Sequence, residues 1–377
     1  MAVAAFTIGC GMRVIDPLMP MMAREFGVGI GAIAPLIGGF ALAYGLGQLG
    51  SGPLGDHWGK LRVAGVALVI YAATLLVASL ATGLHALLAM RIVSGLFASA
   101  VIPLFLAHIG DSVPYDRRQG VIGSFLTGMV MAQLLAGPIS GAMGELTGWR
   151  GSFLVLGGIA AAVAALFAIK LGAGWRGGPV GGGAKGMGGF LLLLSRRNSR
   201  RLLLAAGADG LLLFGGALPF VASLLIESFG LSTAMAGLVA AAFGLGSLIY
   251  TRSAAWLVRW LGEPGMVLWG GIGLGAGLLA MATAPVWQVV AAGTLLMGAT
   301  FFMLHGVLQA RATEALPEAR GTAVAGFAMA IFLGQSIGAV IFGMVIAVWG
   351  FRPGFFVAAA GTLVLTWAIR RYVLPRG

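Results

Sequence analysis

Twelve apolar runs, each about as long as a helix that crosses a lipid bilayer, constrain the fold of this chain more than any other feature. A spanning helix needs roughly 20 predominantly apolar residues. Of the 377 residues, 59% are hydrophobic and only 9% are charged. The runs lie near residues 3–22, 32–51, 63–82, 85–107, 119–144 and 151–170, and again near 202–226, 234–251, 265–283, 286–309, 321–348 and 353–370. The pattern predicts an all-α membrane protein.

The twelve runs form two sets of six, separated by a glycine-rich and basic segment. We expect an N-terminal six-helix bundle over residues 1–170, a cytoplasmic linker over 171–201 and a C-terminal six-helix bundle over 202–377. No basic leader precedes the first run, so we interpret that run as a retained span and not as a signal peptide.

Short motifs recur at a constant separation and indicate an internal duplication. Residues 114–117 (PYDR) resemble residues 317–320 (PEAR), which lie 203 positions later (317 − 114). Residues 148–150 (GWR) resemble residues 350–352 (GFR), which lie 202 positions later (350 − 148). Two pseudo-symmetric bundles of this kind place a cavity at their interface, and rocking of one bundle against the other gives alternating access.

The distribution of Lys and Arg between the loops predicts the orientation, since such residues concentrate in cytoplasmic loops. The loops after runs 2, 4, 6, 8 and 10 and the C-terminal tail are rich in Lys and Arg, whereas the opposite side has only Arg24, Arg150 and Arg352. Both termini are therefore expected in the cytoplasm, with the protein in a bacterial inner membrane. The net charge of +12 is explained by this basic face beside anionic lipid, without nucleic acid.

A compact charged turn between runs 2 and 3 carries the first motif. Residues that match the signature G-x-L-a-D-r-x-G-r-k are Gly52, Leu54, Asp56, Gly59 and Lys60, with Arg62 following. In this turn the sequence resembles the major facilitator superfamily, and in particular its twelve-helix drug/proton antiporter branch. His57 and Leu61 depart from the signature. A tight turn with solvated charges is the alternative interpretation.

The resemblance implies that this turn locks the two halves together on the cytoplasmic side, with Asp56 near a helix N-terminus of the other half. A carboxylate is stabilised there by the helix dipole and by free N–H donors. The second copy of the turn aligns Gly262 with Gly59 and has Arg259 in place of Asp56. We therefore expect one working latch, with its partner around Arg320 and Gly321.

Two further motifs resemble the same family. Arg91 and Gly95 fit a motif of the fourth span, with Ser94 in place of the usual glutamine. Gly137, Pro138 and Gly141 fit the centre of the antiporter motif of the fifth span, although Gln133 and Ala142 replace two of its glycines. The alternative interpretation of the second motif is a packing kink, because proline bends a helix and small residues allow close approach.

Charged residues at membrane depth are costly and mark functional sites or structural pairs. In the N-terminal half the candidates for proton coupling are Asp16, Arg91 and Arg13. Asp16 and Arg91 lie at similar depth and could meet in the cavity, with Asp16 carrying a proton. Two alternatives remain open: Arg13 and Asp16 neutralise each other at i,i+3 spacing, or Asp16 caps the helix break at Pro17.

In the C-terminal half the charged candidate is Asp209, either as a second protonation site or as a wet interfacial residue near Arg200 and Arg201. Glu145 is expected at the outer end of span 5. Uncharged or weakly basic residues that could line the pathway, or simply pack by hydrogen bonding, are Gln48, Gln133, His305, Gln309 and Gln335.

The sequence also predicts what the protein lacks. Cys10 is the only cysteine, and no phosphate-binding loop, metal-ligand cluster or hydrolase elbow is present, so we expect no metal, no cofactor and no enzymatic activity. The leading hypothesis is a monomeric transporter that exports a small hydrophobic or amphipathic molecule in exchange for protons. Uptake by a symporter or facilitator is the alternative, and a membrane sensor without transport is a third hypothesis.

Overall fold

The computed structural model describes residues 1–172 and 186–374, and within these ranges the chain is helical and has no β-strand. Part of the predicted linker, residues 173–185, lies outside the described residues. Within the described residues, ten segments are long and apolar enough to cross a membrane. Two of these reverse direction at a glycine, so the chain crosses twelve times, as the apolar runs predict.

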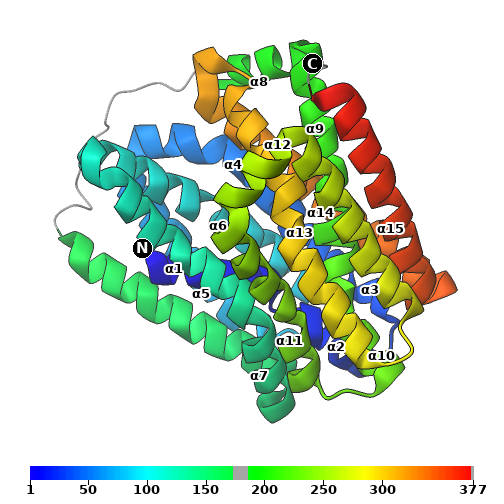
Figure 1. Ribbon diagram of the computed structural model, residues 1–377. Coiled ribbons are helices and arrows are strands. Elements are labelled where there is room, and N and C mark those ends of the chain that lie inside the picture. The colour runs from blue at the N-terminus through cyan, green and yellow to red at the C-terminus, as the bar shows by residue number, and fades with distance from the viewer. Residues whose placement is uncertain (173–185, 375–377) are drawn as a thin grey trace.

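The N-terminal half contains the first six crossings, drawn in blue to green in Figure 1. Crossing 1 is made of three short helices, crossing 2 of two, and crossings 5 and 6 share one helix. The elements are α1 (Ala2–Arg13), η1 (Asp16–Leu18), α2 (Met19–Phe26), α3 (Ile30–Ile33), α4 (Pro35–Trp58), α5 (Lys60–Ala78), α6 (Leu84–Ser112) and α7 (Tyr115–Leu171).

The C-terminal half repeats this plan after the short helix α8 (Gly186–Ser195). Crossing 7 contains a π-helical stretch, η3, and crossings 8 and 9 share α12. The elements are α9 (Arg197–Asp209), η3 (Gly210–Ala217), α10 (Leu218–Phe229), α11 (Thr233–Ala240), α12 (Ala242–Thr283), α13 (Trp287–Glu314), η4 (Pro317–Ala319), α14 (Arg320–Trp349), α15 (Phe351–Ala368) and η5 (Ile369–Val373).

The duplication is visible in the backbone. Positive φ angles occur at Gly27 and Gly230, at Gly59 and Gly262, and at Gly148 and Gly350. Each pair is separated by 202 or 203 residues (230 − 27, 262 − 59, 350 − 148), as are the sequence motifs. Glycine adopts this left-handed conformation without steric cost. The structure therefore confirms two pseudo-symmetric bundles.

Repeated side-chain contacts stabilise equivalent turns in the two halves. Arg150 donates to the carbonyl oxygen of Ala81 at 2.8 Å, and Arg352 donates to that of Ala284 at 3.1 Å. Lys60 forms an ion pair with Asp111, whereas Glu263, the residue 203 positions after Lys60 (263 − 60), forms an ion pair with Arg311. Arg311 lies 200 residues after Asp111 (311 − 111), about one helical turn before the position equivalent to Asp111, so the second pair joins neighbouring places with the charges exchanged.

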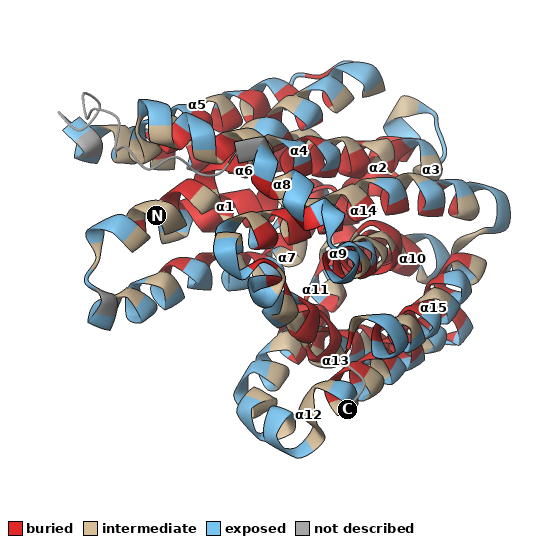
Figure 2. Ribbon diagram, turned by 90° about the horizontal axis from the view of Figure 1, so that it is seen from above, coloured by how far each residue is buried: buried red, intermediate tan, exposed pale blue. Residues whose placement is uncertain are grey.

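The two halves meet at one end of the molecule, which we call the closed end, where α2, α3, α10 and α11 lie (Figure 1). The other end, which holds the turn after α4 and the ion pairs of Lys60 and Arg311, we call the basic end. Buried residues face the interior of each bundle and exposed residues face its perimeter (Figure 2). The perimeter includes many large apolar side chains, such as Leu80, Val348 and Trp260, as expected for a surface in contact with lipid.

Close glycine contacts form the seam between the halves. Gly137 of α7 lies against Gly237 of α11, and a Cβ on Gly237 would come 2.2 Å from the carbonyl oxygen of Gly137. Gly31 of α3 lies in the same way against Gly343 of α14, where a Cβ on Gly31 would come 2.4 Å from a carbonyl oxygen. The antiporter-type motif therefore supplies one side of the seam.

We predict that Gly237→Ala opens the closed end. Overpacking costs about 1–3 kcal/mol, so the population with this end shut should fall by roughly 5- to 150-fold. Spin-label distances between the α2–α3 turn and the α10–α11 turn, in a variant without Cys10, measure this shift. Gly123→Ala in α7 is the control, because a Cβ there meets nothing within 4 Å. Unchanged distances in Gly237→Ala would contradict the role of the seam.

Candidate functional site

The first span is broken where its charged residues lie. Helix α1 ends at Arg13, the 3-10 turn η1 covers Asp16–Leu18, and α2 begins at Met19. Pro17 has no N–H, so the hydrogen bond that a continuous helix would make at this position is missing. The break turns the Asp16 side chain into the protein interior, where the residue is 9% exposed.

Asp16 is held by one partner. Its Oδ2 atom accepts a hydrogen bond from Arg13 Nη1 at 3.2 Å, and its Oδ1 atom is buried and has no partner among the residues that the structure describes. The i,i+3 pairing with Arg13, one of the two alternatives from the sequence, is present. No side-chain capping bond is made at η1, so Asp16 does not cap the break at Pro17.

Arg13 reaches from the N-terminal half to the C-terminal half. Its guanidinium carbon lies 5.3 Å from the ring centroid of Phe214 in η3, a cation–π distance. Its side chain is 12% exposed. The pair of Arg13 and Asp16 therefore lies at the interface about which the halves would move.

Arg91 is not bonded to Asp16 within the described residues. It is 1% exposed and donates to the carbonyl oxygens of Gly11 at 2.8 Å and Leu36 at 3.3 Å. Its guanidinium carbon lies 4.2 Å from the ring centroid of Phe40, and its Nη2 atom has no hydrogen-bond partner in the described part of the chain. Arg91 thus ties α1, α4 and α6 together and keeps a positive charge inside the N-terminal half.

The C-terminal half contains a buried pair that the sequence did not predict. Asp209 Oδ2 lies 2.7 Å from His305 Nδ1, and Asp209 is fully buried. The interpretation of Asp209 as a wet residue near Arg200 and Arg201 is therefore wrong. His305 is surrounded by aromatic rings, with Phe301 stacked at 4.6 Å between centroids. Comparing depths could have found the pair, since both residues lie several positions in from the same end of spans 7 and 10.

A small cavity joins these elements across the interface. Residues of both halves line it: Arg13, Asp16, Pro17, Gln133, Ala136 and Gly137 from one half, and Leu218, Ala222, Ala240, Ala241 and Phe243 from the other. It has two charged side chains and an otherwise largely apolar wall. The cavity holds about 30 Å³, far below the roughly 300–1,000 Å³ of ordinary ligand pockets, so in this conformation it has room for little more than water.

The remaining polar candidates are dispersed. Gln133 is exposed and lines the cavity. Gln335 is buried in α14 beside η3, and its backbone carbonyl oxygen would lie 2.0 Å from a Cβ on Gly215. Gln48 is half-buried and Gln309 is exposed. The structure does not bring these four residues together.

The charged turn at the basic end makes no latch in this conformation. Asp56 is half-buried and has neither a hydrogen bond nor an ion pair among the described residues. Arg320 and Gly321, the expected partners, are exposed. Lys60 of the same turn instead forms an ion pair with Asp111 of α6, within its own half.

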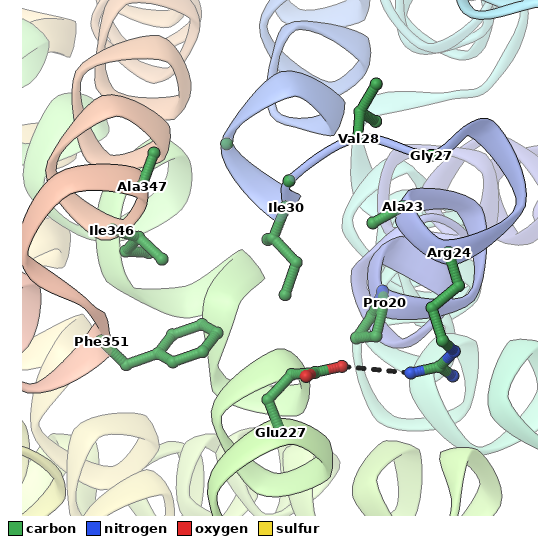
Figure 3. A pocket seen from close by; sticks show the side chains of 12 residues that line it. Pro20, Ala23, Arg24, Gly27, Val28, Ile30, Glu227, Ile346, Ala347 and Phe351 are labelled. Atoms are coloured by element: carbon green, nitrogen blue, oxygen red, sulfur yellow. Dashed lines mark hydrogen bonds and ion pairs between the residues drawn. The ribbon is translucent and has the colours of Figure 1, made fainter.

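At the closed end, polar contacts join the halves. Arg24 of α2 and Glu227 of α10 point toward each other across a surface pocket and form an ion pair of 3.1 Å (Figure 3). Glu145 of α7 accepts a hydrogen bond from the backbone N–H of Ala234, in the first turn of α11, at 3.0 Å. These contacts and the glycine seam hold the closed end shut.

The arrangement defines a class of protein: a helical membrane protein built from two repeated bundles with a charged site between them. The chain belongs to the Major Facilitator Superfamily, whose model matches residues 1–262 and 202–376.

Curated relatives match part of the chain. It is 27% identical over 155 residues to the uncharacterized MFS-type transporter YwfA of Bacillus subtilis, covering 41% of this chain and 38% of that protein. It is 25% identical over 154 residues to the 4-hydroxybenzoate transporter PcaK of Pseudomonas aeruginosa, covering 41% and 34%. The aligned region thus spans little more than a third of these relatives.

Solved structures match the whole chain. A bacterial homologue of the human lysosomal transporter Spinster, in an inward-facing and unoccupied conformation, has a TM-score of 0.80 at 18% identity and covers 100% of this chain and 98% of its own. A D-xylose–proton symporter has a TM-score of 0.75 at 16% identity, with 99% and 96% covered. At these identities the likeness establishes the fold.

We predict that His305→Phe destabilises the protein by about 3–5 kcal/mol, because Asp209 would be left buried without a partner. The variant Asp209→Asn/His305→Phe should recover most of this loss, since an amide carries no charge. Thermal unfolding in detergent measures both, with His85→Phe at an exposed position as control. A His305→Phe protein as stable as the parent would show that the pair contributes nothing.

Proposed function

We propose that this protein is a proton-coupled secondary transporter of a small organic molecule, working by alternating access, and that Asp16 carries the proton. The observation that supports this is the state of the Asp16 carboxyl: buried at the interface of the halves, paired through one oxygen, and unpartnered at the other. A carboxyl whose surroundings change as the halves move can gain a proton on one side and lose it on the other.

The orientation belongs to the same proposal. The basic end faces the cytoplasm, both termini lie there, and the protein works as a monomer in a bacterial inner membrane. The conformation described here is then the inward-facing one, because the contacts of Arg24, Glu145 and the glycine seam shut the opposite end. Asp56 makes its latch when the halves close over the basic end.

Two directions of coupling are candidates. Export in exchange for protons is favoured by the antiporter-type motif at Gly137, Pro138 and Gly141, which lies directly on the seam. Uptake together with protons is favoured by Arg13, whose single ion-pair partner Asp16 would release it on protonation. The resemblance to a 4-hydroxybenzoate transporter makes an aromatic acid a suitable first compound for testing uptake.

We predict that Asp16→Asn abolishes accumulation driven by a pH gradient and leaves counterflow intact, because the amide cannot exchange a proton. Proteoliposomes loaded with a pH-sensitive dye and offered benzoate, benzamide and benzylamine report flux and the direction of proton movement together. Asp116→Asn is the matched control, since that carboxylate is 75% exposed. Full gradient-driven accumulation by Asp16→Asn would exclude Asp16 as the carrier.

We also predict that Asp56→Ala slows transport by up to about fivefold without weakening binding. The carboxylate makes no hydrogen bond or ion pair in this conformation, so its loss should not destabilise this conformation. The loss should destabilise the opposite conformation by about 0.3–1 kcal/mol if the carboxylate caps a helix there. Labelling of single cysteines placed on η4 at the basic end measures the shift, with Asp116→Ala as control. Equal labelling of Asp56→Ala and the parent would argue against a latch.

A further inference from the structure

We propose that the basic end carries a binding site for an anionic phospholipid, formed where the start of α9 meets η5. The site combines five arginines with an apolar, exposed surface beside them. The five arginines, which we call the basic cluster, are Arg197, Arg200, Arg201, Arg370 and Arg371. The proposal concerns the C-terminal half alone, so it depends neither on Asp16 nor on the direction of transport.

Two segments that lie far apart in the sequence bring the basic cluster together at the end marked C in Figure 1. Arg201 donates from Nη1 to the carbonyl oxygen of Tyr372, 171 residues later, at 3.4 Å. Its guanidinium carbon also lies 5.6 Å from the centroid of the Tyr372 ring. The other two arginines of α9 lie within about one turn before Arg201, and those of η5 directly precede Tyr372. Long side chains from both segments can therefore reach one headgroup.

The basic cluster has no acidic partner in the part of the chain that the structure describes. Other cations at the same end are neutralised by ion pairs: Lys60 with Asp111, Arg196 with Glu318, and Arg311 with Glu263. The positive end of the α9 dipole adds to the repulsion, because α9 begins at Arg197 and has no acidic residue in its first turn. A bound anion would relieve this repulsion.

The basic cluster lies at the depth of lipid headgroups. The apolar run of crossing 7 begins at residue 202, directly after Arg201, and that of crossing 12 ends at residue 370. Trp367 and Tyr372 are exposed beside the cluster and contact each other at 5.7 Å between ring centroids. Such rings concentrate at the boundary between hydrocarbon and water, because one end of each ring is apolar and the other is polar. The phosphate of a phospholipid would lie level with the arginines.

Toward the middle of the membrane, the surface beside the basic cluster is apolar. Leu204, one turn after Arg200 in α9, is 74% exposed, and Val364 of α15 is also exposed. Helices α9 and α15 contact each other, and α15 stands at the edge of the molecule in Figures 1 and 2. An acyl chain that lies along these side chains would add apolar contact to the ionic contact of the headgroup.

The basic cluster is not part of the repeated framework, and its composition suits phosphate. The residues 203 positions before Arg370 and Arg371 are Phe167 and Ala168 (370 − 203, 371 − 203). All five members are arginines, and the guanidinium fork binds two phosphate oxygens at once. An excess of charge that served only to orient the chain could be spread over any of the loops on that side. Its convergence from two segments on one place favours recognition of a headgroup.

The test compares compounds added to the purified protein in detergent. The probes are phosphatidylglycerol, cardiolipin, phosphatidylcholine and soluble glycerol 3-phosphate. Native mass spectrometry counts the bound molecules, and thermal unfolding measures their effect. We expect phosphatidylglycerol and cardiolipin to bind and to raise the unfolding temperature, and the other two probes to do neither. Arg200→Gln/Arg371→Gln should weaken binding of the two anionic lipids by roughly 30-fold, because two contacts with the headgroup are lost.

Two further variants keep the result interpretable. Arg200→Lys/Arg371→Lys should retain most of the binding, because the charge is kept. Arg117→Gln/Arg252→Gln removes two exposed arginines elsewhere at the basic end and should bind the anionic lipids as the parent does. Equal binding of phosphatidylcholine, undiminished binding by Arg200→Gln/Arg371→Gln, or an equal loss in Arg117→Gln/Arg252→Gln would each overturn the inference. Stabilisation by glycerol 3-phosphate as strong as that by lipid would indicate a site for free phosphate and would also overturn it.

Discussion

A charge inside the membrane has no water to solvate it, and the arrangement of the interior follows from this constraint. Asp16 is tolerable because Arg13 lies one turn away, and Asp209 because His305 reaches it from α13. Arg91 is tolerable because backbone carbonyls of two other helices accept its hydrogen bonds. Each solution also ties helices together, so the charged residues that could serve transport are structural as well.

The duplication separates the framework from the site. Turns and ties recur at the same offset in both halves, including the hydrogen bonds of Arg150 and Arg352 and the positive-φ glycines. The buried charges do not recur: 203 positions after Asp16 and Arg91 stand Pro219 and Thr294 (219 − 16, 294 − 91). Features shared by both halves explain how the protein folds. The proposed chemistry rests on features found in one half only.

The fold could be predicted from the sequence alone because it depends on patterns that can be recognised within short segments of the chain. Twelve apolar runs fix the crossings, and the repeat offset fixes the pairing of the halves. The pair of Asp16 and Arg13 was one of the alternatives that the sequence offered, because i,i+3 spacing on a helix is also local. Asp209 and His305 are 96 residues apart, and no local signal connects them. Arg91 could not be assigned to carbonyl oxygens because those acceptors belong to the backbone of other helices.

The ion pair of Arg24 and Glu227 connects two positions that the duplication makes equivalent, since they are 203 residues apart (227 − 24). Two identical copies of one half would place the same side chain at both positions, and like charges would face each other across the symmetry axis. This attraction could arise only after the copies had become different. The ion pair at the closed end therefore shows that the two halves are no longer interchangeable at these equivalent positions.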